Sequence, residues 1–156
     1  MSDMNQRSRG QALVEFALVF PFVALLIFGI IDLGRFAFTA NSLNNAAREG
    51  ARAGSVQFFP PECAGFSWPN QRQQCIVAAA QAKVTGVTSP TTVTPTCERL
   101  DPAEADGLRV VPVSQCHVRD LLTVRVQTNF NLITPLIAQL LGSLTIAGET
   151  QVKVNQ

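Results

Sequence analysis

Residues 11–31 read QALVEFALVFPFVALLIFGII, and this stretch decides the architecture of the chain. Residues 16–31 carry no charged side chain. The run is close to the ~20 residues that a helix rising ~1.5 Å per residue needs to cross a bilayer. It is longer than the apolar region of a cleaved secretory signal, and residues 32–35, DLGR, follow it in place of a small-residue cleavage site. We therefore predict a transmembrane helix over about residues 12–32.

The same helix, residues 11–54, is expected to continue beyond the membrane. Apolar side chains recur at helical spacing as far as Ala51, with polar side chains between them. Ala46, Gly50 and Gly54 form a small-residue face at four-residue spacing, which allows another element to approach closely, although Gly54 also fits a helix C-cap. The outer part of the helix must pack either on the protein's own sheet or on helices of neighbouring molecules, and the first arrangement is favoured.

The remainder, residues 55–156, is expected to form a small domain that contains an antiparallel sheet. Its clearest strand is Leu122–Phe130, in which apolar and polar residues alternate, and the predicted partner is Leu144–Val154. Arg109–Val113 is a shorter strand candidate. Residues 89–96, SPTTVTPT, favour an edge strand because their prolines discourage pairing.

Two short helices complete the prediction. Asn70 fits an N-cap and Gly86 a stop, so Gln71–Val84 is predicted as a covering helix. Thr134 is expected to cap a short apolar helix within residues 135–142. The apolar residues of that helix either form a patch for a partner or, as we favour, close the small core: Leu136, Ile137, Leu140 and Leu141.

These elements predict an α+β fold. In it, a long amino-terminal transmembrane helix continues outside the membrane and packs on a small antiparallel β-sheet with short helices.

Four cysteines follow the hydrophobic segment, in stretches rich in proline, glycine and polar residues: Cys63, Cys75, Cys97 and Cys116. An even number in a small loop-rich domain is typical of disulfides formed in an oxidising compartment. Four cysteines allow three pairings, and the shortest sensible loops join Cys63 to Cys75 and Cys97 to Cys116. Free buried thiols and a zinc site are the alternatives. Zinc is disfavoured because no two cysteines are closely spaced and the single histidine, His117, adjoins Cys116.

Residues 1–10 form a short leader that indicates the orientation of the helix. Arg7 and Arg9 outweigh Asp3, which favours retention of the amino terminus in the cytoplasm. Arg35, just beyond the span, weakens that argument. The cysteines decide it, because a domain with disulfides belongs outside the cytoplasm. We expect a cytoplasmic leader and an extracytoplasmic domain.

Glu15 is a carboxylate inside the apolar run, where burial of an ionised group costs several kcal/mol. One explanation is that it lies near the interface and reaches the head groups. The other is that Gly10 ends a short basic leader, with Glu15 as the fifth residue after it and Phe16 as the sixth, a spacing that resembles the processing site of prepilins. If a prepilin peptidase cut after Gly10, Glu15 would neutralise the new α-amino group of Gln11 on a neighbouring subunit.

The resemblance extends over residues 9–52, RGQALVEFALVFPFVALLIFGIIDLGRFAFTANSLNNAAREGAR. This stretch is similar to the amino-terminal signature of the TadE-like family: a G-x-x-x-x-E-F start, a proline in the span, an acid and a glycine at its outer end, and a closing A-A-R-E-G-A-R. The resemblance implies a minor pilin or pseudopilin that is needed for biogenesis of the tight-adherence (Tad, Flp-type) pilus, which is related to type IV pili and associated with secretion and cell adhesion. It also implies a pilin-like architecture.

The resemblance implies roles for four residues. Gly10 and Gln11 would form the processing site, and Glu15 and Phe16 would take part in assembly and charge pairing. The expected partners are the lipid bilayer, a prepilin peptidase, other pilin-like subunits and Tad assembly proteins. The expected location is the bacterial inner (cytoplasmic) membrane, with the carboxyl-terminal domain periplasmic or extracellular.

Composition and motifs disfavour other classes of protein. A formal net charge of +1 gives no footprint for nucleic acid. One histidine and no tyrosine leave little for acid–base or nucleophilic catalysis, and no P-loop, dinucleotide fingerprint, G-x-S-x-G or H-E-x-x-H motif occurs. The acids within residues 98–106 do not have the EF-hand spacing. We expect no metal, no cofactor, no small-molecule substrate and no enzyme activity.

The leading prediction is therefore a processed, pilin-like structural subunit. The alternative is an uncleaved, single-pass anchored module whose extracytoplasmic domain binds a ligand, and an enzyme ranks third.

Overall fold

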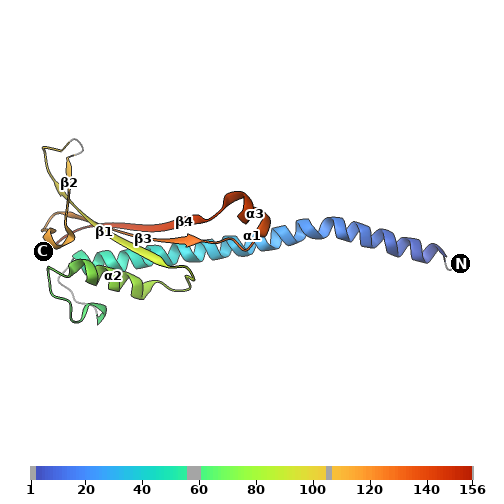
Figure 1. Ribbon diagram of the computed structural model, residues 1–156, viewed down its shortest axis with the longest axis horizontal. Coiled ribbons are helices and arrows are strands. Elements are labelled where there is room, and N and C mark those ends of the chain that lie inside the picture. The colour runs from blue at the N-terminus through green and yellow to red at the C-terminus, as the bar shows by residue number, and fades with distance from the viewer. Residues whose placement is uncertain (1–2, 56–60, 105–106, 156) are drawn as a thin grey trace. The chain divides into compact units, whose positions relative to one another are not determined.

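The structure, a computed structural model, describes residues 3–55, 61–104 and 107–155. It confirms the predicted α+β class, with a long apolar amino-terminal helix, a four-stranded antiparallel sheet and short helices (Figure 1). Short 3-10 helices occupy Pro61–Cys63 and Val113–Gln115. The remaining elements are α1 (Asp3–Ser55), α2 (Arg72–Lys83), β1 (Thr91–Leu100), β2 (Leu108–Val111), β3 (Leu121–Phe130), α3 (Pro135–Leu141) and β4 (Leu144–Lys153).

The chain forms two compact units, and α1 contributes to both. The first unit holds Met1–Phe36 together with Asn131–Ser143, and the second holds Ala37–Phe130 together with Leu144–Gln156. The connection between β3 and β4, which includes α3, therefore groups with the amino-terminal part of α1 and not with the sheet.

This grouping corrects one prediction. The apolar residues of α3 were expected to close the core of the domain, but Leu140 is 84% exposed. Ile137 is half-buried, while Leu136 and Leu141 lie outside the described side chains. The spacing of apolar residues is the same in a helix that packs on a protein core and in a helix that lies in an apolar environment. The sequence pattern therefore does not distinguish these two cases.

The sheet has the order β2-β1-β3-β4, with every neighbouring pair antiparallel. The predicted alternation along β3 is confirmed, because every second side chain from Leu122 to Phe130 is buried. β1 is an edge strand only in part. β2 pairs with Cys97–Leu100, whereas Thr91–Thr96 has β3 alone as a partner. Pro95 lies in that unpaired edge, where its missing N–H removes no bond to β2.

The outer part of α1 packs on its own domain, as predicted, through small residues. A Cβ at Gly50 would lie 3.0 Å from Ala80 Cβ on α2 and 3.2 Å from Val124 Cγ1 on β3. A Cβ at Gly54 would lie within 2.6 Å of side-chain atoms on both elements. α1, α2 and the buried face of the sheet therefore approach so closely that no side chain fits at Gly54 unless its neighbours shift, and Gly54 is a packing residue.

The start of α2 differs from the prediction. The residue at the N-cap position is Gln71 rather than Asn70, and its side chain makes no capping bond. The backbone N–H of Gln71 donates to the Ser67 carbonyl at 2.7 Å, and the backbone N–H of Arg72 donates to the Pro69 carbonyl at 3.1 Å. Because the preceding turn already supplies backbone acceptors for these groups, a side-chain cap is not needed.

Candidate functional site

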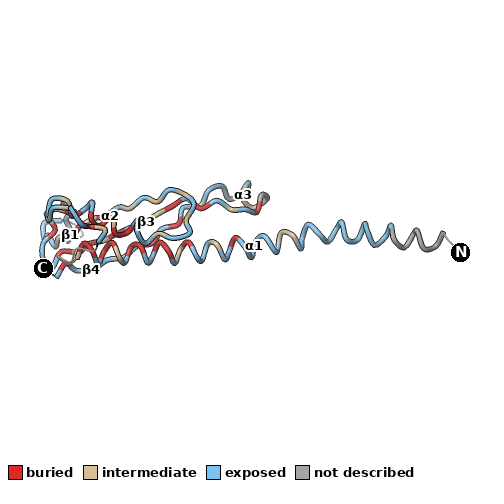
Figure 2. Tube along the Cα trace, turned by 90° about the horizontal axis from the view of Figure 1, so that it is seen from below, coloured by how far each residue is buried: buried red, intermediate tan, exposed pale blue. Residues whose placement is uncertain are grey.

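The amino-terminal part of α1 is apolar and uncovered. No residue from Gly10 to Ile31 is buried, and Figure 2 shows this part of the helix as mostly exposed, with a few intermediate residues. Phe22 is 71% exposed and Leu18 67%. The best 18-residue window has a mean hydropathy of 2.6, and none of it is buried. By length and composition, α1 can cross a membrane.

The residues of the predicted processing and pairing site all lie in this part of α1. Gly10, Gln11, Glu15 and Phe16 are each exposed. Glu15 is four residues after Gln11 and shares its side of the helix. A Cβ at Gly10 would meet no heavy atom within 4 Å, so packing does not require a glycine there. The roles of these residues in processing and pairing stay predictions.

Asp32, directly after the apolar run, is 4% exposed and binds the connection between β3 and α3. Its carboxylate accepts the backbone N–H of Ile133 at 3.0 Å and that of Thr134 at 3.0 Å. The Thr134 hydroxyl also donates to it, at 2.8 Å. Arg35, one turn further along α1, pairs with Asp32 at 3.1 Å and donates to the Asn131 carbonyl at 3.3 Å. We call these five residues the Asp32 clamp.

The sequence does not predict the clamp, because it marks Asp32 only as an acid at the outer end of the span. Thr134 does occupy the N-cap position of α3, as predicted, but its side chain makes no capping bond and donates to Asp32 instead. A charged acceptor forms the stronger hydrogen bond. The partners are 101 and 102 residues apart in the chain, so no local motif marks them.

A second polar centre lies at the outer end of α1. Arg72 of α2 is 2% exposed, and its guanidinium donates to the carbonyl of Gly54 and, at 2.8 Å, to that of Cys116. The Trp68 ring lies 4.6 Å from the guanidinium carbon. Carbonyls in the last turn of a helix lack intrahelical partners, and a cation is favourable there. Burial lowers the pKa of Arg72, and the negative charge of Asp120 opposes that fall.

Asp120 joins the sheet to the second disulfide loop. Its carboxylate accepts the Arg99 Nε–H on both oxygens, at 3.1 and 3.2 Å, the Arg99 Nη2–H at 2.8 Å, and the backbone N–H of His117 at 2.8 Å. Burial alone would raise the pKa of Asp120, but the bonds from Arg99 and His117 and their positive charges hold it below its ordinary value. The same bonds raise the pKa of Arg99, against the effect of burial.

The structure joins Cys63 to Cys75 and Cys97 to Cys116, the pairings with the shortest sensible loops. The first disulfide packs against Ala53 of α1 in the core. Cys97, Cys116 and Asp120 also lie close enough to suggest a metal site. A disulfide sulfur is not a thiolate, however, so this set offers a cation only one carboxylate, which already binds Arg99.

Comparison with known proteins assigns the amino-terminal third of the chain. Residues 10–52 match the model of the family described as TadE-like protein. Over these residues the chain is TadE-like. No curated protein and no solved structure matches it.

The TadE-like segment spans both units of the fold. Its first part is the uncovered apolar helix with Asp32 at the end. Its last part, residues 46–52, supplies small residues to the core, since Ala46, Ala47 and Ala51 are fully buried. The fold therefore accounts for the end of the TadE-like segment by internal packing, and for Asp32 by the clamp.

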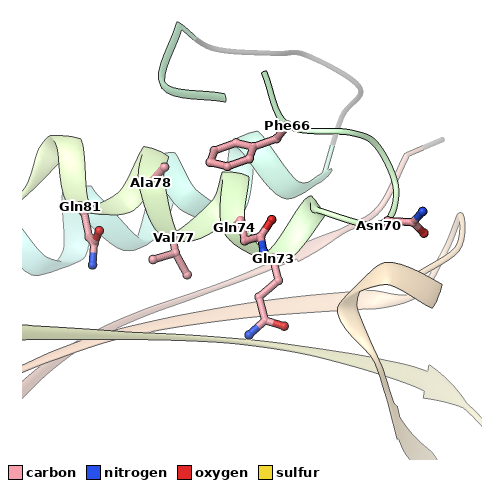
Figure 3. Close-up of a pocket in the computed structure, with 7 residues that line it drawn as sticks. All are labelled: Phe66, Asn70, Gln73, Gln74, Val77, Ala78 and Gln81. Atoms are coloured by element: carbon pink, nitrogen blue, oxygen red, sulfur yellow. The ribbon is translucent and has the colours of Figure 1, made fainter. Parts of the chain in front are cut away.

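Outside the TadE-like segment, α2 carries an open pocket of about 540 Å³ (Figure 3). Figure 3 shows Phe66 against one side of α2, with the side chains of Gln73, Val77 and Gln81 extending from another. The lining is apolar or a neutral amide throughout: Phe66, Asn70, Gln73, Gln74, Val77, Ala78 and Gln81.

Proposed function

We propose that this chain is a TadE-like minor pilin or pseudopilin, a single-pass structural component of Tad (Flp-type) pilus assembly. The observation that carries the proposal is the match of residues 10–52 to the TadE-like family over a helix whose apolar side chains are uncovered. A stripe of exposed Phe, Leu and Ile along such a helix requires lipid or other helices around it.

The proposed topology has the leader in the cytoplasm and the sheet domain outside. Arg7 and Arg9 in the leader favour this orientation. The two disulfides support it, because disulfides persist in oxidising compartments. In a bacterium this places the helix in the inner membrane and the domain in the periplasm or, after assembly, in a pilus.

Processing by a prepilin peptidase is proposed between Gly10 and Gln11. A Cβ at Gly10 would meet no heavy atom within 4 Å, so the fold gives no structural reason for a glycine at this position. Recognition by a peptidase would give one. Cleavage would release a positively charged α-amino group at Gln11 in an apolar setting.

Glu15 is proposed to pair with that amino group on a neighbouring subunit. Both charges lie in residues 11–31 of α1, which carry no other ionisable side chain, so each is poorly solvated in a membrane unless it pairs with the other. Phe16, beside Glu15, stacks 5.4 Å from Phe20 between ring centres and extends the apolar contact surface.

The test has two parts. Amino-terminal sequencing of the mature protein should begin at Gln11, and an intact leader would exclude processing. Glu15→Ala should leave cleavage intact yet abolish co-assembly with the other pilin-like subunits. Glu49→Gln is the matched control, since Glu49 lies on the same helix in a pair with Arg52 at 3.8 Å. Wild-type assembly of the Glu15→Ala variant would remove the pairing role.

The alternative, an uncleaved anchored binding module, has the pocket on α2 in its favour. It predicts that the leader persists and that Gln73→Ala and Gln81→Ala change a binding phenotype without affecting assembly. The assembly subunit predicts the opposite on both counts.

A further inference from the structure

The connection from β3 to β4 is an uncharged segment that belongs to the same unit as the apolar helix. Residues 131–143 read NLITPLIAQLLGS and carry no ionisable side chain. They group with Met1–Phe36, apart from the sheet that they interrupt. Thr134, at the start of α3, is bound to Asp32 of α1. Leu140 is 84% exposed and Ile133 51%. The segment therefore presents apolar side chains outward where a water-facing connection would present polar ones.

The Asp32 clamp fixes the height of this segment along α1. Residues 11–31 span ~31 Å as a helix, which matches the ~30 Å hydrocarbon core. Asp32 and Arg35 are then at the outer head-group boundary. Because Asp32 binds Ile133 and Thr134 directly, the start of α3 lies at the same level.

We propose that α3 and the loop before it form a second membrane contact, lying in the outer head-group region with Ile133 and Leu140 directed into the acyl boundary. The proposal rests on the proposed function only in taking α1 as the membrane span. The ligand is the lipid surface itself, recognised by apolar side chains without a charged group.

Several backbone N–H groups of the segment are hydrogen-bonded within the protein, as a surrounding of low polarity requires. The N–H groups of Ile133 and Thr134 are bound by Asp32, and those of Ala138 and Gly142 donate to carbonyls four residues earlier. Backbone polar groups near hydrocarbon must be satisfied within the protein. Burial of a Leu or Ile side chain in lipid removes its apolar surface from water, so Ile133 and Leu140 would both stabilise an interfacial position of the segment.

A second copy of the chain could also cover these side chains. The bilayer is favoured because the clamp binds this segment to α1 directly after the apolar run, which lipid must cover in any case. A contact of this kind would also restrict the tilt and rotation of α1, which a single span leaves free.

Tryptophan scanning of the full chain in phosphatidylcholine vesicles tests the proposal. Leu140→Trp is the probe, Phe22→Trp marks the middle of the span, and Leu100→Trp, at a 75% exposed site in the other unit, is the matched control. The parent chain, with Trp68 alone, gives the background. Quenching is measured with lipids that carry bromine either near the head group or deep in the acyl chain.

We expect the emission of Leu140→Trp to shift to the blue and to be quenched most by shallow bromines, with Phe22→Trp quenched most by deep ones and Leu100→Trp by neither. An unquenched Leu140→Trp beside a quenched Phe22→Trp would overturn this inference and leave the anchor intact. An unquenched Phe22→Trp would overturn the span as well. A blue shift of Leu140→Trp that grows with protein density, without bromine quenching, would show a second copy at this surface and also overturn the proposal.

Discussion

The two compact units of this chain treat their apolar residues in opposite ways. In the second unit, Leu43, Leu122 and Val124 are fully buried between α1, α2 and the sheet. In the first unit, none of the apolar residues of α1 from Leu13 to Ile31 is buried, and the two buried positions that the structure describes, Asp32 and Thr134, are polar. The second unit is thus explained by contacts within the chain, whereas the first requires an environment that the chain does not provide.

Glycine shows the same contrast between the units. A Cβ at Gly148 on β4 would lie 2.5 Å from two backbone atoms of α1, in Leu43 and Asn44. A Cβ at Gly34 would meet nothing within 4 Å. One glycine is required by packing inside the chain, and the other is not.

The largest expected effect therefore comes from Gly148→Ala. Backbone atoms cannot move aside as a side chain can, so the strand must separate from α1, and we expect a loss of about 3 kcal/mol in the free energy of unfolding. Gly34→Ala is the matched control, for which alanine is favoured by up to ~1 kcal/mol in a helix. Urea unfolding of the full chain in detergent measures both.

Two outcomes sharpen the comparison. Equal stability for Gly148→Ala and the parent would mean that β4 and α1 are not in close contact. If Gly34→Ala folds normally but fails in pilus assembly, a neighbouring molecule requires the glycine at this position. Residues near the end of the first unit would then also depend on contacts outside the chain.

The Asp32 clamp should give the next largest effect. In Asp32→Asn an amide nitrogen or a weaker oxygen replaces acceptors that now receive bonds from Ile133, Thr134 and Arg35. Losing hydrogen bonds to a charged group costs about 2 kcal/mol, which corresponds to roughly 30-fold faster amide exchange. Hydrogen exchange of the full chain should show this acceleration at Ile133 and Thr134.

Glu49→Gln is the control for that measurement. Glu49 is also an acid of α1 with an Arg partner three residues on, but its pair with Arg52 is 3.8 Å long and largely exposed. Such a pair contributes less than ~1 kcal/mol. Exchange at residues 131–134 should be unchanged in Glu49→Gln. Unchanged exchange in Asp32→Asn would mean that contacts other than the clamp hold the segment.

Most of the second unit could be predicted from sequence, because its information is local. Alternation identified β3 and β4, and four-residue spacing of Ala46, Gly50 and Gly54 identified the packed face of α1. The match to the TadE-like family was likewise visible in one continuous stretch.

What could not be predicted depends on partners distant in the chain. Nothing near Asp32 or Arg72 marks the groups that they bind, which lie 101 and 102 residues away for Asp32, and 18 and 44 residues away for Arg72. The same holds for Thr134, which occupies the predicted N-cap position but donates its hydroxyl to the distant Asp32. The start of α2 differs for a local reason, because the preceding turn already supplies backbone acceptors.

The smallest expected effect is a pH dependence confined to the second unit. Arg99 and His117 hold the pKa of Asp120 below its ordinary value of 3.8 in the folded chain, despite the opposing effect of burial. Stability from this group is complete above pH ~4 and is lost as the pH falls through the lower, folded pKa, because the unfolded chain takes up the proton first.

Urea midpoints between pH 6 and pH 2 should therefore fall less steeply for Asp120→Asn than for the parent. Asp101→Asn is the control for the loss of one carboxylate, since Asp101 pairs with Arg109 at 3.9 Å near the surface. Equal slopes for the parent and Asp120→Asn would mean that the carboxylate is as well solvated in the unfolded chain as it is bound in the folded one. The acid sensitivity of the protein would then have to originate elsewhere, with the Asp32 clamp as the next group to test.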